Sequence, residues 1–352
     1  SFGSGTTVYQ GDNRFSLKNI LFFQNRLELR KENKYFVRAY ATHENAGDSY
    51  DPYFTALRLL ESSKEDVAWS RDYVSYWLQN INPRIRQQGY PQIQVEVDPN
   101  TGQITSSFDR EGAAAWLAAN QDSLFTWHSQ AEVFANSANL LNGGGAYLQP
   151  GTEAFNQKFE DITTTSRNAG GTLFTDRSAL YHVHGEYKFT PEWTDELTVG
   201  ANGRLYTPIS DGTLFTDTAG VTITNYEFGF YGGLNKKFLD DKLTASATVR
   251  VDKNQNFRWL VSPAASLVYN PTANNYLRLS FSSAIRNPTL TDQYLSLNVG
   301  RAILAGNING VQDLVTIESL GEYIIDLDRD KLEFFDIPAI QPEEVKSFEV
   351  VR

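Results

Sequence analysis

Strict alternation of apolar and polar residues is the dominant pattern along the chain. In residues 243–251 every second residue is apolar, and the residues between them are Thr, Ser or Arg. Successive side chains of a β-strand point to opposite faces of a sheet, so this segment predicts a strand with one apolar and one polar face. The same pattern occurs in residues 196–206 and 276–282.

Further segments carry enough of this alternation to be expected as strands. They are residues 15–29, 35–41, 181–189, 226–234 and 265–269. Most of the expected strands are close to the roughly 9 to 11 residues with which a tilted strand crosses a bilayer. No apolar run of roughly 18 residues occurs, which excludes crossing by apolar helices. If the chain lies in a membrane, it must therefore do so as a β-barrel.

The connections between the expected strands alternate between short and long. The short ones, rich in Pro, Asn or Asp, are residues 31–34, 190–195, 236–241 and 270–275. The long ones are residues 43–179, 207–225, 253–263 and everything from 285 onward. Tight periplasmic turns and long extracellular loops give this asymmetry in outer-membrane barrels. The sequence therefore predicts an all-β fold, a transmembrane antiparallel up-and-down β-barrel, with the whole chain 1–352 as part of a single barrel domain.

The segment 44–178 is too long to be a structureless loop. Apolar residues at helical spacing occur in residues 52–79 and 113–120. We therefore expect a long extracellular loop region with helices of its own, ordered above the barrel mouth. An independent soluble domain inserted into the chain is the alternative.

Composition narrows the function classes. Forty-two acidic and 31 basic residues give a net charge of −11, which argues against a general nucleic-acid binder. The absence of cysteine excludes disulfides, thiolate metal sites and a cysteine nucleophile. The 18 Tyr, 22 Phe and 6 Trp suit the aromatic girdles of a barrel, although a soluble carbohydrate-binding β-protein could show the same excess. No nucleophile elbow or phosphate-binding loop is present, so we do not expect an enzyme.

Three groups of polar residues could carry chemistry. His182, His184 and Glu186 lie on one face of an expected strand, at a spacing that could bind zinc. A polar wall of a water-filled barrel explains them more simply, and no third strand supplies an obvious ligand, so the expected metal site is none. The acidic residues 326, 328 and 330 have the opening spacing of a calcium loop, but Lys331 and Ile337 occupy positions that require Gly and Glu. This is not an EF-hand, and only a looser structural calcium site in an extracellular loop stays open.

Arginines occupy the polar face of three expected strands, at Arg204, Arg250 and Arg278. A charge in hydrocarbon near the midplane would cost about 2 to 4 kcal/mol, so these side chains must face the lumen. We expect them to pair with acidic groups of a plug, with guidance of an anionic substrate as the alternative.

Candidate ligand contacts come mainly from aromatic residues, which can stack on sugar rings or hold peptide side chains. They are Trp69, Tyr73, Trp77, Tyr206 and Arg286. The loop aromatics, with Trp116 and Trp127, more often form small hydrophobic cores. Arg286 opens an RNPT stretch whose Pro288 cannot extend a ladder, so a strand must end there.

Several stretches in order along nearly the whole chain resemble one family. They are GSGTTVYQGDNRFSLKNI (3–20), YFVRAYATHENAGDSYD (35–51), SALYHVHGEYKF (178–189), SDGTLFTDT (210–218), VRVDKNQNF (249–257), SFSSAIRNPTLTDQY (280–294) and IQPEEVKSFEV (340–350). The chain resembles the TonB-dependent outer-membrane receptors, specifically the starch-utilisation (SusC-like) branch and its carboxypeptidase-regulatory-domain relatives.

The resemblance implies a bacterial outer-membrane barrel of 22 strands, plugged by an N-terminal domain and energised through the TonB complex. It implies a receptor that imports an oligosaccharide, peptide or chelate, without a cofactor, with a SusD-like surface lipoprotein as a further expected partner. The plug, the TonB-coupling box and the closing strand have no counterpart here, so we expect an internal barrel fragment. A non-importing barrel serving as a structural or secretion-machine component is the alternative.

Overall fold

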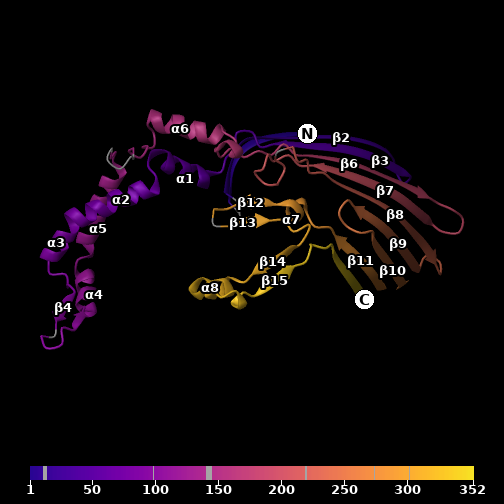
Figure 1. Ribbon diagram of the computed structural model, residues 1–352. Helices are drawn as coiled ribbons and strands as arrows, with labels where there is room; N and C mark the ends of the chain where they lie inside the picture. Colours follow the sequence, from indigo (N-terminus) through magenta and orange to yellow (C-terminus); the bar gives the residue numbers. More distant parts are fainter. Residues whose placement is uncertain (11–13, 98, 140–144, 219, 273, 301) are drawn as a thin grey trace. The chain divides into compact units, whose positions relative to one another are not determined.

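Ten strands form one antiparallel sheet in the computed structural model, which describes residues 1–352 except 11–13, 98, 140–144, 219, 273 and 301. The sheet order is β1-β2-β3-β6-β7-β8-β9-β10-β11-β16, so its strands are neighbours in the order in which they follow one another along the chain (Figure 1). Their bounds are β1 (Phe2–Gln10), β2 (Arg14–Lys31), β3 (Tyr35–Asn45), β6 (Ala179–Phe189), β7 (Glu196–Thr207), β8 (Asn225–Phe238), β9 (Leu243–Asn254), β10 (Leu260–Thr272), β11 (Asn275–Arg286) and β16 (Glu343–Val351). Over the described residues the sheet is open, and β1 and β16 are its edges.

The alternating segments are confirmed as strands of this sheet. All eight expected strands are present, and the mostly-β, antiparallel character of the fold is confirmed. The pairing of neighbouring strands also agrees with the predicted apolar and polar faces. Val249 of β9 faces Pro263 of β10 and Gly232 of β8, so residues of the apolar set oppose one another across strands. The edge strand β1 was missed, because Gly and Thr dilute its alternation. The expected long connection from residue 285 onward was too long, because the edge strand β16 begins at Glu343.

The apolar face of the sheet is exposed rather than packed under a second layer of described structure. Phe230 is 55% exposed, Val249 is 46% exposed and Val261 is 54% exposed, although all three lie within the sheet. Soluble monomers rarely leave such a contiguous apolar surface in water. A face of this kind is what a barrel wall presents to acyl chains.

Short turns close one end of the sheet and longer connections leave the other; we call these the turn end and the loop end. The turns after β2, β6, β8 and β10 fall where they were expected, and of the expected turn 270–275 residue 273 lies outside the described residues. The expected long loop 253–263 was wrong, because β9 continues to Asn254 and β10 already begins at Leu260. Pro263 is accommodated in β10 because pairing with β11 begins only at Ala264.

A small hydrophobic cluster orders the connections at the loop end. Phe15 stacks on Phe174 with ring centroids 4.1 Å apart, and Ala46 and Leu297 are buried with them. The short elements of this region are η2 (Arg167–Ala169), α7 (Leu290–Tyr294), β12 (Ser296–Asn298), β13 (Ile303–Ala305), β14 (Val311–Val315), α8 (Ile317–Asp326), η3 (Arg329–Lys331) and β15 (Phe334–Ile337).

Residues Pro52–Thr163 form a second compact unit, within the segment 44–178. Its elements are α1 (Pro52–Ser63), α2 (Asp66–Tyr76), η1 (Trp77–Ile81), α3 (Asn82–Gln87), β4 (Gln94–Val97), β5 (Ile104–Ser107), α4 (Arg110–Ala119), α5 (Gln121–Asn136) and α6 (Glu153–Thr164). Helices cover the residues where helical spacing was noted. Ile81, Trp127 and Ala131 form its core. Across the part of the chain that the structure describes, no helix is both long and apolar enough to cross a membrane.

The extracellular position of this unit stays a prediction.

A buried ion pair stabilises the unit. Lys64 Nζ lies 2.7 Å from Asp72 Oδ2, and both side chains are fully buried. Lys64 also donates to the carbonyl oxygens of Ala135 and Ser137 at the end of α5, at 2.6 and 2.7 Å. One cation thus fastens the end of α1 and the first turns of α2 to the end of α5.

Candidate ligand-binding site on the polar face

The polar face of the sheet brings together residues that are far apart in sequence. His182 of β6 faces Arg204 of β7, Arg204 faces Glu227 of β8, and Glu227 faces Asn254 of β9. This row lies near the loop end of the sheet. Directly opposed side chains on one face lie about 4.5 to 5.5 Å apart at Cβ, so the row is a continuous band of hydrogen-bonding groups.

Glycines on this face make room for large side chains. A Cβ on Gly200 would lie 2.2 Å from Cζ of Tyr231, so the tyrosine ring covers the glycine on the neighbouring strand. The Tyr231 hydroxyl donates to Glu186 Oε2 at 2.7 Å and lies 2.9 Å from Nε2 of His184. Tyr231 therefore links His184 and Glu186, two of the three residues that were considered as metal ligands.

The weak zinc candidates do not converge on a common point. His184 and Glu186 are both bonded to the Tyr231 hydroxyl, whereas neither ring nitrogen of His182 has a hydrogen-bond partner. Among the described residues, no three His, Asp or Glu side chains are arranged so that they could hold a metal ion. The expectation that no metal binds here stays a prediction.

The three polar-face arginines have acidic partners within the sheet itself. Arg250 contacts Asp252 at 2.6 Å, and Arg278 contacts Glu349 of β16 at 2.6 Å. Arg204 lies 3.8 Å from Glu227, which is beyond hydrogen-bond distance. Their position on the polar face follows from the alternation. That this face lines a lumen, and that a plug also contacts it, stay predictions.

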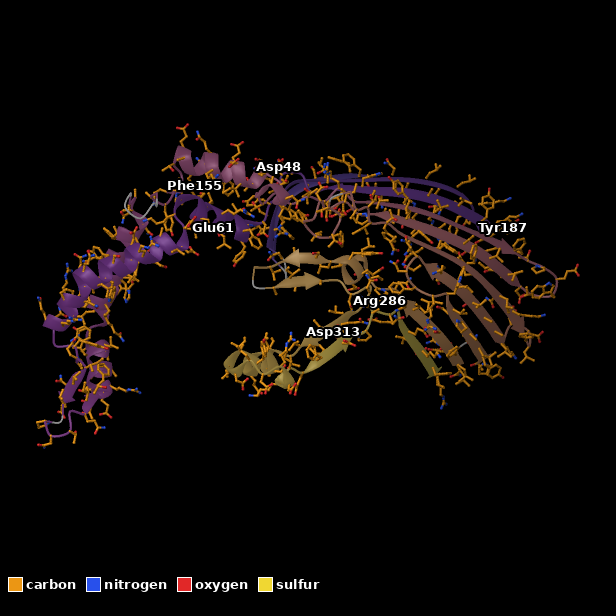
Figure 2. The ribbon with its side chains drawn as sticks, in the orientation of Figure 1. Asp48, Glu61, Phe155, Tyr187, Arg286 and Asp313 are labelled. Carbon is orange, nitrogen blue, oxygen red and sulfur yellow. The ribbon has the colours of Figure 1, made fainter. Side chains whose placement is uncertain are left out.

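A cavity of about 810 Å³ lies against this band at the loop end. The strands contribute His182, Arg204, Tyr206 and Glu227 to its wall, and the segment after β11 contributes Asn287 and Gln293. Of the candidate ligand contacts, Tyr206 thus lines the cavity. Arg286 ends β11 and lies 3.6 Å from Glu343 of β16. Figure 2 shows Arg286 at the loop end and Tyr187 toward the opposite, turn end of the sheet.

Side-chain amides fix the RNPT segment over the strands, and those of Gln293 and Asn225 are buried. Gln293 accepts from the amide nitrogens of Asn225, at 3.4 Å, and Asn256, at 2.7 Å. Gln293 also donates to the carbonyl oxygen of Pro288 at 2.7 Å. The strand β11 does end at Arg286, as Pro288 requires. One wall of the cavity is therefore preorganised by hydrogen bonds.

The same segment is stabilised by a capped helix. Thr289 and Asp292 form a capping box at the start of α7, each bonding the other's backbone N–H. The hydrogen bonds from the Thr289 hydroxyl and backbone hold the pKa of Asp292 below its usual range. The helix start is thus charge-stabilised at neutral pH.

A second cavity of about 420 Å³, lined by Glu44, Asp176 and Tyr206 among others, also lies at the loop end. The Asp176 and Glu44 side chains are hydrogen-bonded, and Ser178 donates to Asp176 through its backbone and its hydroxyl. Burial raises the pKa of Asp176, and the nearby Asp217 charge raises it further, against the lowering effect of Ser178. Two facing carboxyls at this position share a proton more readily than exposed ones do.

The acidic residues at 326, 328 and 330 serve the chain itself in this structure. Asp326 pairs with Lys331, and Asp328 accepts the backbone N–H of Asp330 at 3.1 Å. These bonds close the turn between α8 and β15. Calcium binding by an extracellular loop stays a prediction.

The aromatic candidates of the helical unit stack on one another. Ring centroids are 5.1 Å apart for Trp69 and Tyr73, and 6.2 Å apart for Tyr73 and Trp77. Tyr73 and Trp77 also pack against the core around Ile81, as Trp116 does, while Trp127 belongs to that core. Burial raises the pKa of Tyr73, and the charge of Glu132 adds to this. These contacts give the aromatics a structural role, and ligand contact by them is untested.

Several residues of the site were not singled out from the sequence. Tyr231 and Glu227 occupy polar-face positions of β8, so the alternation could have placed them on that face. Gln293 carries no such signal, because it lies in a short helix after the strand. Its role depends on contacts with Asn225 and Asn256, which are separated from it by tens of residues.

The family described as TonB dependent receptor-like, beta-barrel, matches residues 8–350. No curated protein is significantly similar to the chain in sequence. Two crystal structures of mutant ferric enterobactin receptor from Pseudomonas aeruginosa are similar, one of them in complex with enterobactin. Both are 12% identical, with TM-scores of 0.33 and 0.32, over 79% and 80% of this chain. The chain spans only 34% and 36% of their length.

Proposed function

Since the chain belongs to the TonB-dependent receptor-like β-barrel family and is therefore an outer-membrane protein, we propose that its parent molecule imports a nutrient ligand by energy-coupled gating. The observation that carries this proposal is the two-faced sheet. Its apolar face is exposed as lipid contact requires, and its polar face carries a preorganised cavity at the loop end.

The proposal includes closure of the sheet into a barrel of 22 strands. Both edge strands, β1 and β16, have an unpaired side within the described residues. In a membrane such edges must be satisfied by further strands, because hydrocarbon offers no hydrogen bonds. The long connections at the loop end, including the helical unit, would then lie outside the cell.

The partners are the lipid bilayer and the TonB complex, which acts through a plug domain. The stretches that resemble the SusC-like branch support a further partner, a SusD-like surface lipoprotein. The ligand would be an oligosaccharide, a peptide or a chelate, bound between the loops and the plug. A barrel with a passive structural or secretion role would need neither the plug nor the TonB complex.

Uptake of labelled ligands in the native host tests the proposal. Cells would be supplied with labelled oligosaccharides, peptides and metal chelates, with and without the gene and with and without TonB. We expect uptake of one ligand class to require both. Uptake that is unchanged by loss of either would contradict import.

A pair of substitutions connects this assay to the cavity. Ser262 lines the cavity on the polar face, whereas its neighbour Val261 is exposed on the apolar face. Ser262→Trp fills the cavity and should reduce uptake, while Val261→Trp places the same side chain toward lipid and should not. Equal uptake by the two variants would show that transport does not depend on the cavity.

A further inference from the structure

His182 is a buried side chain without a hydrogen-bond partner. It is only 7% exposed, and neither Nδ1 nor Nε2 is bonded. Its ring is held by packing alone, with its centroid 4.7 Å from that of Tyr40 at 87° and 6.0 Å from that of His184 at 20°. Buried polar groups in native proteins nearly always have partners. An imidazole that lines a cavity and lacks one indicates a partner from outside the described residues.

Arg204 is the neighbour that defines the chemistry of this partner. It stands directly opposite His182 across β6 and β7, and both residues line the cavity. A guanidinium has five N–H donors. The carboxylate paired with Arg204, that of Glu227, lies 3.8 Å away, and the Arg204 guanidinium has a hydrogen bond with the Tyr206 side chain. Donors of Arg204 therefore remain available beside the imidazole.

The other cations of the cavity lining are already engaged. Arg250 donates to Asp252 and to Asn202, each at 2.6 Å. Lys253 donates to the backbone carbonyl oxygens of Asn254 and Phe257. In the lining, the cations Arg204, Arg250 and Lys253 face two carboxylates, Glu227 and Asp252. The described lining thus has an excess of one positive charge. Arg204 is the cation of this lining that still has free donors.

We propose that His182 and Arg204 together bind a carboxylate group. The imidazole N–H of His182 and the guanidinium of Arg204 donate to the carboxylate oxygens. Each donor then has a charge-assisted hydrogen bond. The carboxylate belongs either to a soluble ligand or to an acidic side chain elsewhere in the same protein. This inference rests on the proposed function in one respect: water must reach the polar face of the sheet.

Binding of succinate to the full-length protein in detergent tests the proposal, with uncharged succinamide as the matched probe. The variants are Arg204→Gln and His182→Phe, in which Phe keeps an aromatic ring against Tyr40. Arg278→Gln is the control, because Arg278 lies on the same face, outside the cavity lining, and forms a closer ion pair with Glu349 at 2.6 Å. Calorimetric titration and the midpoint of thermal unfolding are the two measurements.

If the carboxylate comes from a ligand, succinate binds and succinamide does not. Arg204→Gln and His182→Phe then weaken succinate binding by about tenfold or more, as loss of a charge-assisted hydrogen bond does, and Arg278→Gln leaves it unchanged. Glu227→Gln tightens binding, because Arg204 loses its competing carboxylate; a purely structural role of Arg204 would not give this result.

If the carboxylate belongs to the protein, succinate does not bind to the wild type. Arg204→Gln then lowers the unfolding midpoint of the unliganded protein more than Arg278→Gln does, although Arg278 has the closer ion pair. No succinate binding together with equal midpoints for the two variants overturns the proposal. Uptake that is unchanged by loss of the gene or of TonB, with succinate binding intact, would refute import and leave this site in place.

Discussion

The Lys64–Asp72 pair offers the sharpest stability prediction, because both side chains are fully buried. In Lys64→Met the cation is removed while Asp72 stays buried, together with the carbonyl oxygens of Ala135 and Ser137 that Lys64 had satisfied. Removing one partner of a buried ion pair typically costs about 3 to 5 kcal/mol. The population in which the helical unit is open should then rise by about two to four powers of ten.

Urea unfolding followed by tryptophan fluorescence measures this cost in the full chain, because four of the six tryptophans lie in residues 52–163. Lys158→Met is the matched control in the same unit. Lys158 pairs with Asp161 at 3.1 Å, with side chains that are 40% and 64% exposed. Such an exposed pair contributes only about 0 to 1 kcal/mol. The reasoning is refuted if Lys64→Met costs no more than Lys158→Met.

Two further predictions concern the strand and loop contacts. Gly200→Ala should displace the Tyr231 ring from its hydrogen bonds with Glu186 and His184 and lower the free energy of unfolding in detergent by about 1 to 3 kcal/mol. Gly232→Ala should lower it less, because the nearest atom to the added Cβ would be 3.8 Å away. Equal losses of stability in the two variants would contradict the ring placement. The pKa of Asp176 is raised in the folded state, so above its ordinary value of 3.8 the folded loop binds more protons than the unfolded one and loses stability as pH rises. The backbone amides of residues 172–178 should therefore be less protected from hydrogen exchange at pH 8 than at pH 5, after correction for intrinsic rates. If Asp176→Asn showed the same pH dependence, titration of Asp176 would not be its cause.

The sequence could predict the strands because their pattern is local. Strict alternation in β9 and β7 is visible without knowing which strands pair. The expected loop at 253–263 was wrong because Pro263 lies inside β10, and tolerance of a proline there depends on where pairing with β11 begins, which local sequence does not show. The helix α5 was missed because its buried positions include Ala131 and Ala135, which mark an apolar face weakly.

The candidate site was only partly predictable for the same reason. Alternation put His182 and Arg204 on polar faces, but only the register between β6 and β7 places them opposite each other. The interactions of Tyr231 depend on a glycine in a neighbouring strand. The cavity wall formed by Gln293 depends on its hydrogen bonds with Asn225 of β8 and with Asn256 beyond the end of β9, which local sequence does not determine.

The central claim is that the two faces of the sheet meet different solvents, lipid on one side and water on the other. These 352 residues contain no cysteine, so a cysteine placed at Val249 or at its neighbour Thr248 can carry one nitroxide label on β9, in the full-length protein with any cysteine outside these residues replaced and in lipid bilayers. We predict that the label at Val249 collides more with oxygen, which partitions into lipid, and the label at Thr248 more with a water-soluble nickel complex. Preferential collision of the Val249 label with the nickel complex would contradict the account.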